Sequence, residues 1–156
     1  MPSDPGRRGD AYRRRLADHA APELQPGERT VAMLPFATVA KLPRSPERRG
    51  RKNKVRFGIR QSWRRYRPLV VTNRRLLVFD SGRTPSARTL LADFALDDVA
   101  VGPVTPGRYG TSTFTLSLPG HGDVPFETGR REAHDLEVLQ TILVADRRGD
   151  QAMRCP

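Results

Sequence analysis

The sequence predicts a mainly β protein, a small barrel or sandwich of short antiparallel strands capped by one C-terminal α-helix. Three observations predict this class. Residues 69–72 and 76–79 are rich in β-prone residues and flank a short polar turn, which is typical of a β-hairpin. Residues 111–118 alternate between apolar and polar, as a half-buried strand does. Residues 133–145 place apolar side chains at helical spacing, and the open end of a barrel is a natural place for that apolar face to pack.

Residues 1–25 are expected to form a flexible N-terminal segment. Pro, Gly and charged residues dominate residues 1–9, and such a composition buries too little apolar surface to fold. Residues 10–20 are compatible with a short helix that has Asp10 as its N-cap. Its apolar face holds only Ala11, Leu16 and Ala20. This thin face predicts weak docking or none.

The folded domain is predicted to span residues 26–146, and a disordered polar tail is predicted over 147–156. The first strand covers residues 29–39 and should break or bulge at Pro35, because proline cannot donate to a sheet ladder. The hairpin supplies the next two strands. Further strands are expected over residues 89–96, around 99–102, and over 111–118 and 124–127. Thr128 is the predicted N-cap of the C-terminal helix.

The positive charge of the chain is concentrated in one stretch. Residues 41–75 carry 14 Lys and Arg and a single acid, Glu47, while the net charge of the whole chain is +11. Arg makes up 25 of the 28 basic residues, so Arg-rich codon usage is the plain alternative. Codon usage would spread arginine evenly along the chain. A local block therefore favours an anionic partner.

We call residues 41–67 the basic segment and expect it to be an insertion in the domain. Residues 41–54 combine two prolines and a glycine with many cations, which predicts a loop. Residues 55–60 alternate and predict a half-buried strand, either an added one or an extension of the second strand. Trp63 and Tyr66 follow among arginines.

The remaining composition limits the compartment and the cofactors. Cys155 is the only cysteine, so the sequence predicts no intramolecular disulfide and no zinc cluster. No stretch approaches the ~18 apolar residues of a membrane-spanning helix, and the N-terminus does not read as a signal peptide. We expect a cytoplasmic protein, or one peripheral to the inner face of the membrane, without metal or cofactor.

Signals for catalysis are poor. His19, His121 and His134 have no Ser or Cys nucleophile at a suggestive spacing, and solvated surface positions account for them best. No Gly-rich loop precedes a helix in the phosphate-binding pattern. The Asp97-Asp98 pair is better explained as a strand end and turn than as a metal pair. The sequence therefore predicts a protein that is not an enzyme.

Three short motifs carry a family resemblance: Pro26-Gly27-Glu28 before the first strand, the hairpin string of residues 71–79, and Leu96-Asp97-Asp98-Val99 before the fifth strand. With the C-terminal helix, their order over residues 26–146 resembles the bacterial pleckstrin-homology-like (PH-like) domains. The resemblance implies a PH-like small barrel of about seven antiparallel strands in two roughly orthogonal sheets, closed at one end by the helix. The basic segment departs from that pattern.

The basic segment contains the candidate binding site. Eukaryotic relatives of the PH-like fold grip phosphoinositide headgroups through a Lys and a later Lys/Arg-x-Arg in the first inter-strand loop, and Lys41 with Lys54-Val55-Arg56 resembles this arrangement. Arginine forks bind phosphate bidentately. Trp63 and Tyr66 are the predicted interfacial anchors. The predicted anion-binding residues are Lys41, Lys52, Lys54, Arg56, Arg60, Arg64 and Arg65.

These observations lead to a first hypothesis and two alternatives. The first is a non-catalytic module that docks on acidic phospholipid headgroups or on an acidic partner protein. The second is a nucleic-acid-binding protein that uses the same residues, with Trp63 and Tyr66 stacking on unpaired bases. The plain alternative has Trp63 plugging the barrel edge beside solvated arginines. A sheet edge near Arg67 is also available for pairing with another copy.

Overall fold

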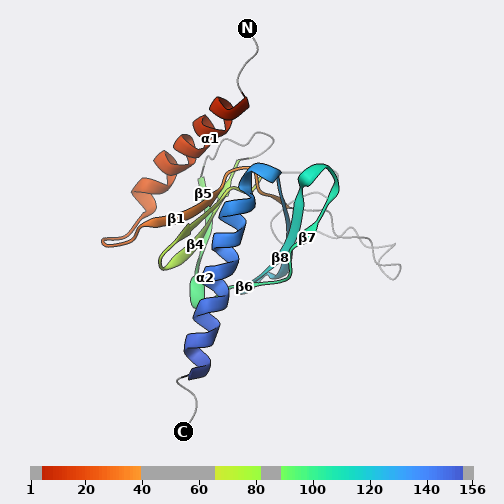
Figure 1. Cartoon of the computed structure of the whole chain (residues 1–156). Coiled ribbons are helices and arrows are strands. Elements are labelled where there is room, and N and C mark those ends of the chain that lie inside the picture. Colours follow the sequence, from red (N-terminus) through yellow and green to blue (C-terminus); the bar gives the residue numbers. More distant parts are fainter. Residues whose placement is uncertain (1–4, 40–65, 82–88, 153–156) are drawn as a thin grey trace, which may run out of the picture.

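The computed structural model describes residues 5–39, 66–81 and 89–152, and it shows two antiparallel β-sheets and two α-helices (Figure 1). The first sheet has the strand order β1 (Thr30–Leu34), β3 (Leu69–Thr72), β4 (Arg75–Asp80) and β5 (Thr89–Ala95). The second sheet has the order β2 (Thr38–Val39), β9 (Gly122–Thr128), β8 (Ser112–Leu118) and β6 (Ala100–Val101), and β7 (Thr105–Pro106) also pairs with β8. The mainly β class with a C-terminal helix is confirmed.

The first predicted strand passes from one sheet to the other. β1 pairs with β3 in the first sheet, and β2 pairs with β9 in the second. The chain turns between them at Pro35 and Phe36, with the Ala37 N–H donating to the Leu34 carbonyl at 3.3 Å. Proline has no N–H to give to a ladder. The predicted break at Pro35 is therefore confirmed, and it is the corner where the two sheets meet.

The predicted barrel of about seven strands is wrong in two respects. The described residues contain nine strands, and they form two separate sheets with no ladder joining the edge strands β5 and β6. The higher count has two local causes. The first predicted strand is divided at Pro35 into β1 and β2, and the short strand β7 lies at residues 105–106, outside the predicted strands; β6 and β7 pair with successive parts of β8.

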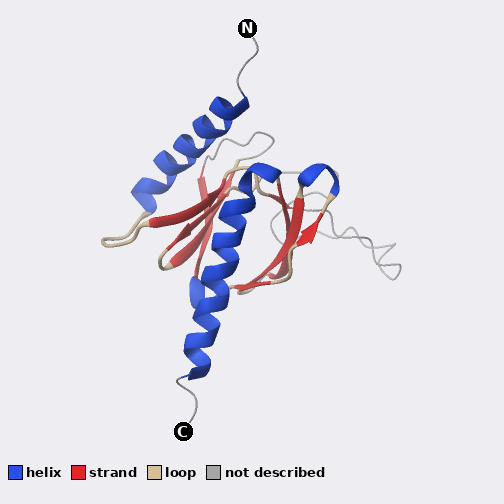
Figure 2. Cartoon of the chain, in the orientation of Figure 1, coloured by secondary structure: helices blue, strands red, loops and turns tan. Residues whose placement is uncertain are grey.

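The main core lies between the two sheets and under the C-terminal helix α2 (Ala133–Ala152). It contains buried residues from β1, β3 and β4 and the inward-facing residues of β8 and β9, and the Phe114 and Phe126 rings stack at a centroid distance of 5.7 Å. The α2 side chains Leu136, Leu139 and Leu143 belong to the same cluster. Figure 2 shows α2 lying across the space between the sheets. The alternation predicted over residues 111–118 and the apolar face predicted for the helix are thus confirmed.

The N-terminal helix differs from the prediction. α1 spans Pro5–Ala20, so it begins before Asp10, and it lies on the outer side of the first sheet (Figure 1). Leu16 and Ala20 are each only 1% exposed and pack against Val70, Leu77 and Phe79. The thin apolar face is sufficient because every one of these contacts falls on a sheet face that is itself apolar. A short 3₁₀ turn, η1 (Ala21–Glu23), links α1 to β1.

The ends of α2 also differ from the prediction. Thr128 is the last residue of β9 rather than an N-cap, and a 3₁₀ turn, η5 (Arg130–Glu132), precedes the helix. α2 continues to Ala152, which overlaps the predicted tail. The predicted strand over residues 55–60 lies outside the described residues.

Candidate functional site

The structure describes only two residues of the basic segment, Tyr66 and Arg67. Tyr66 is half-buried and pairs with Thr38 in an isolated antiparallel bridge, so the junction between the sheets fixes its backbone. The other predicted anchor, Trp63, and all the predicted anion-binding residues lie outside the described residues: Lys41, Lys52, Lys54, Arg56, Arg60, Arg64 and Arg65.

The fold holds the two ends of the basic segment side by side. β2 ends at Val39, just before the segment, and Tyr66 at its far end is paired with Thr38. The Arg67 N–H donates to the Ala37 carbonyl at 2.7 Å. This N–H is therefore used within the chain and is not available for edge pairing with another copy. Residues 40–65 thus begin and end at neighbouring positions beside β2.

Tyr66 also contacts Ser81, the residue that precedes a second stretch with arginines, residues 82–88. Arg67 is only 3% exposed, and its Nη1 donates to Asp80 at 2.5 Å and to the Tyr66 carbonyl at 3.2 Å. Ser81 Oγ donates to the same carbonyl at 3.2 Å. Residues 82–88, which follow Ser81, contain Arg83 and Arg88 and no acid. Residues 40–65 and 82–88 are thus flanked by two residues in contact, Tyr66 and Ser81, which their separation in the sequence does not reveal.

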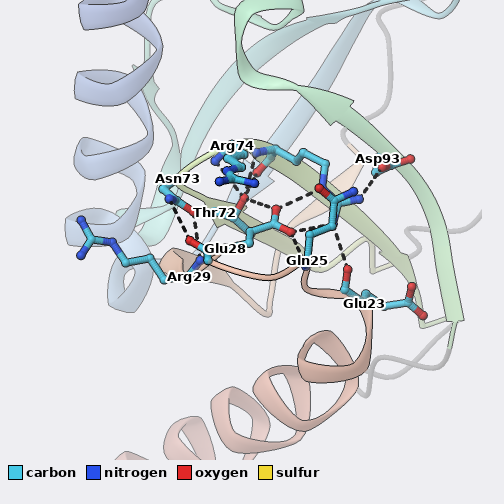
Figure 3. Close-up of polar contacts among 10 residues, drawn as sticks. Glu23, Gln25, Glu28, Arg29, Thr72, Asn73, Arg74 and Asp93 are labelled. Atoms are coloured by element: carbon cyan, nitrogen blue, oxygen red, sulfur yellow. Dashed lines mark hydrogen bonds and ion pairs between the residues drawn. The ribbon is translucent and has the colours of Figure 1, made fainter.

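A second polar group, the Glu28–Arg75 cluster, joins the turn before β1 to the β3–β4 hairpin (Figure 3). Arg75 donates to both Glu28 oxygens, from Nε at 3.0 Å and from Nη2 at 2.7 Å. Thr72 Oγ1 donates to Glu28 at 2.6 Å, and the Gln25 N–H donates at 2.8 Å. Arg75 Nη1 also donates to Asp93 at 2.6 Å. The Glu28 carboxylate is thus held by groups of the chain itself.

The electrostatics of this cluster agree with its geometry. The hydrogen bonds from Arg75 are the main reason that the pKa of Glu28 falls from 4.5 to about 2. The same hydrogen bonds raise the pKa of Arg75 above its ordinary value. Both groups are therefore charged at neutral pH, and the Glu28 side chain is fully buried. A buried pair of this kind fixes one local arrangement of the chain.

The three motifs that resemble the PH-like family meet at the Glu28–Arg75 cluster. Asn73 Oδ1 accepts the Arg29 N–H at 2.9 Å, which ties the hairpin turn to the residue after the Pro-Gly-Glu motif. The Leu96 N–H, in the third motif, donates to the Arg74 carbonyl at 3.1 Å. Among the described non-glycine residues only Tyr109 has a positive φ, so Asn73 acts through its side chain rather than through a left-handed backbone. The contacts among the motifs therefore hold the first sheet together.

A small half-open hollow lies between α1, the Pro35 corner and η5. It has a volume of about 180 Å³ and is lined by Gly9, Asp10, Arg13, Pro35, Phe36, Arg131 and Glu132. Glu132 is 1% exposed, and its carboxylate accepts the Phe36 N–H at 2.8 Å and the Gly129 N–H at 3.3 Å. Burial raises the pKa of Glu132 from 4.5 to about 7. Both oxygens hold backbone groups, so we assign Glu132 to fixing the corner and the start of α2.

The remaining candidates for chemistry are dispersed. His19 and His134 lie on the surface of the two helices, and Asp97 and Asp98 are exposed in a 3₁₀ turn after β5. His121 lies in the β8–β9 turn with its ring edge-on to Phe94 at 5.8 Å. Over residues 5–39, 66–81 and 89–152, no three His, Cys, Asp or Glu residues gather into a group that could hold a metal ion. In the same ranges, neither helix is long and apolar enough to cross a membrane.

Comparison with protein-family models gives no match for this chain, and comparison with curated proteins gives no significant match. The functional argument therefore rests on the residues and on their geometry.

Proposed function

We propose that this chain is a non-catalytic, PH-like binding module that docks on an anionic surface through the basic segment. One observation carries the proposal. Residues 40–65 contain eleven Lys and Arg and one acid, and the paired positions Thr38 and Tyr66 hold the two ends of this stretch together. A local concentration of cations in the chain favours an anionic partner more than an evenly spread charge does.

The architecture supports the PH-like part of the proposal. A strand that bends from one antiparallel sheet into the next, with a C-terminal helix over the space between them, is the arrangement that the sequence motifs imply. The three motifs are also in contact with one another, through the Arg29–Asn73 and Leu96–Arg74 hydrogen bonds.

The chemistry of the basic segment favours a membrane surface. Each Lys or Arg near an anionic leaflet contributes about 1 kcal/mol, so six to eight engaged residues would bind without a specific pocket. Trp63 and Tyr66 suit the headgroup layer, where amphipathic rings gather. The alternative is a nucleic acid, because the same density of cations neutralises phosphates well.

The deciding experiment is co-sedimentation with anionic and with zwitterionic vesicles at near-physiological salt, with and without RNA as competitor. We expect selective pelleting with anionic vesicles that resists RNA. Pelleting abolished by RNA, with a salt slope of about 0.9 log unit per neutralised phosphate on duplex DNA, would favour the nucleic-acid alternative. No pelleting under any condition would favour a nucleic acid or an acidic protein as the partner.

A further inference from the structure

We propose that the turn between β7 and β8 is a second contact point for the anionic membrane, with Tyr109 as the residue that enters the headgroup layer. This inference rests on the proposed function and adds a site outside the basic segment. The Tyr109 side chain is 98% exposed. Figure 1 shows the β7–β8 turn projecting at one end of the second sheet.

The backbone at Tyr109 is unusual. Its φ of 59° and ψ of 30° lie in the left-handed region, which bulky side chains seldom adopt. Glycine or asparagine would meet the needs of the turn at less cost. A strained residue whose ring contacts solvent contributes little to the fold, and such outliers concentrate at functional sites.

The turn holds this conformation firmly. The Gly107 N–H donates to the Thr111 carbonyl at 2.8 Å, and the Arg108 carbonyl accepts both the Thr111 N–H at 3.2 Å and Thr111 Oγ1 at 2.8 Å. A Cβ on Gly107 would lie 2.5 Å from Thr111 Oγ1. Gly110 also has a positive φ, and a Cβ there would lie 3.2 Å from the Arg130 side chain. The ring is thus presented on a rigid support, so little ordering entropy is lost on binding.

The charge around the turn selects an anionic partner. Arg108 is the only charged residue between Asp98 and Asp123. Arg130 packs its aliphatic stem close to Gly110 and is exposed. A tyrosine ring flanked by two arginines matches the boundary between headgroups and acyl chains, where the ring prefers to lie and the cations meet phosphate.

β2, which precedes the basic segment, and β7, which precedes the turn, are linked by one line of cross-strand pairs in the second sheet. Thr38 pairs with Glu127, Glu127 with Thr113, and Thr113 with Thr105. Three strand spacings separate Thr38 from Thr105, which is about 14 Å. The strands that precede the basic segment and the turn, β2 and β7, therefore lie in the same part of the second sheet.

The test uses vesicles of equimolar phosphatidylcholine and phosphatidylserine and two substitutions. Tyr109→Asn removes the ring and tolerates the left-handed backbone, and Leu91→Thr removes apolar surface from β5, where Leu91 is 42% exposed. We expect Tyr109→Asn to bind roughly tenfold more weakly and Leu91→Thr to bind like the unmodified protein. The melting temperature of Tyr109→Asn should not fall, because the ring has no packing role.

A fluorescence measurement locates the ring directly. In a Trp63→Phe background, at vesicle concentrations where this background is shown by co-sedimentation to be bound, Tyr109→Trp is the only tryptophan, and we expect its emission to shift to the blue and to be quenched by lipids with brominated acyl chains. Anionic binding by the unmodified protein with no effect of Tyr109→Asn and no quenching would overturn this inference and leave the proposed function standing. No binding by the unmodified protein would overturn both.

Discussion

Glu28 shows how a single side chain can organise one end of this molecule. In the sequence it is the last residue of a Pro-Gly-Glu turn, yet it lies against Thr72 and Arg75, more than forty residues away. Its charge is buried and fully engaged by donors from three segments. Glu132 is the counterpart at the other end, where a buried carboxylate holds the Pro35 corner and the start of α2. The two carboxyls have opposite pKa shifts because Arg75 dominates at Glu28 and burial dominates at Glu132.

Glu28→Gln should lower the free energy of unfolding by about 3–5 kcal/mol, because breaking a buried ion pair leaves Arg75 without its main partner. Asp93→Asn is the matched control, since the Asp93 side chain is 49% exposed and its pair with Arg75 is worth less than about 1 kcal/mol. Urea unfolding at neutral pH measures both. Equal losses in the two variants would contradict the role assigned to Glu28.

The contribution of Glu28 to stability is present above pH 4.5 and is lost as the pH falls toward about 2.

The pH dependence of Glu132 has the opposite sign. Its pKa is 4.5 in the unfolded chain and about 7 in the folded protein, so between these values only the folded state holds the proton. Its contribution to stability is therefore complete below pH 4.5 and is lost as the pH rises to about 7. We expect this loss to be roughly 3 kcal/mol.

The measurement is the difference in unfolding free energy between the unmodified protein and Glu132→Gln across that pH range. Both proteins contain the charged residues that surround position 132, so the difference between them reports the titration of Glu132. These neighbours are Asp10, Arg13, Arg131 and Asp135. Parallel pH curves for the two proteins would disprove the assignment.

At the scale of elements, α1 explains the burial of the β3–β4 hairpin. All four residues of β3, and Leu76, Leu77, Val78 and Phe79 in β4, are buried, so both faces of these strands are covered. The main core covers one face, and Leu16 and Ala20 of α1 cover the other. Unbroken apolar runs in neighbouring strands are the signature of a sheet buried on both sides. The apolar runs of residues 69–71 and 76–79 are therefore a signal that could have indicated a docked helix, although the thin face of α1 predicted weak docking or none.

Leu16→Asp should detach α1 from the first sheet. The substitution places a charge among Val70, Leu77 and Phe79, and an unpaired buried charge is too costly to keep. We expect faster amide hydrogen exchange throughout α1 and binding of an apolar dye to the uncovered face. Arg14→Asp is the control, because Arg14 is exposed on the same helix. Protected α1 amides in Leu16→Asp would show that other contacts, such as the Arg13–Asp135 ion pair, are enough to hold the helix.

At the scale of the whole molecule, charge is segregated. Residues 41–75 carry +13, while residues 76–156 carry −3. The fold brings together Tyr66 and Ser81, which flank the cationic stretches 40–65 and 82–88. A docking surface therefore depends on where the cations lie rather than on the net charge alone.

Arg56→Glu with Arg60→Glu should weaken binding to anionic vesicles by well over tenfold, because two attractions of about 1 kcal/mol each become repulsions. Arg14→Glu with Arg74→Glu changes the net charge by the same amount at exposed positions outside residues 41–67. We expect this control pair to bind nearly as well as the unmodified protein. Equal weakening in the two double variants would mean that net charge, not the basic segment, drives association.

The sequence by itself determined the order and type of most elements. The hairpin, the paired strands β8 and β9 and the C-terminal helix follow from periodicities of two or 3.6 residues, which are local properties of the chain. The concentration of charge in the basic segment was also visible there. Its anion-binding role stays a prediction, because those residues lie outside the described part of the chain.

Tertiary structure alone decided how these elements fit together. It split the strand at Pro35 between two sheets, docked α1 through Leu16 and Ala20, and joined Glu28 to Arg75 and Arg67 to Asp80. It also left Tyr109 exposed on a rigid turn. Each of these features depends on which distant residues become neighbours, and no local periodicity carries that information. Contacts between distant residues form only when the whole chain has buried its apolar faces.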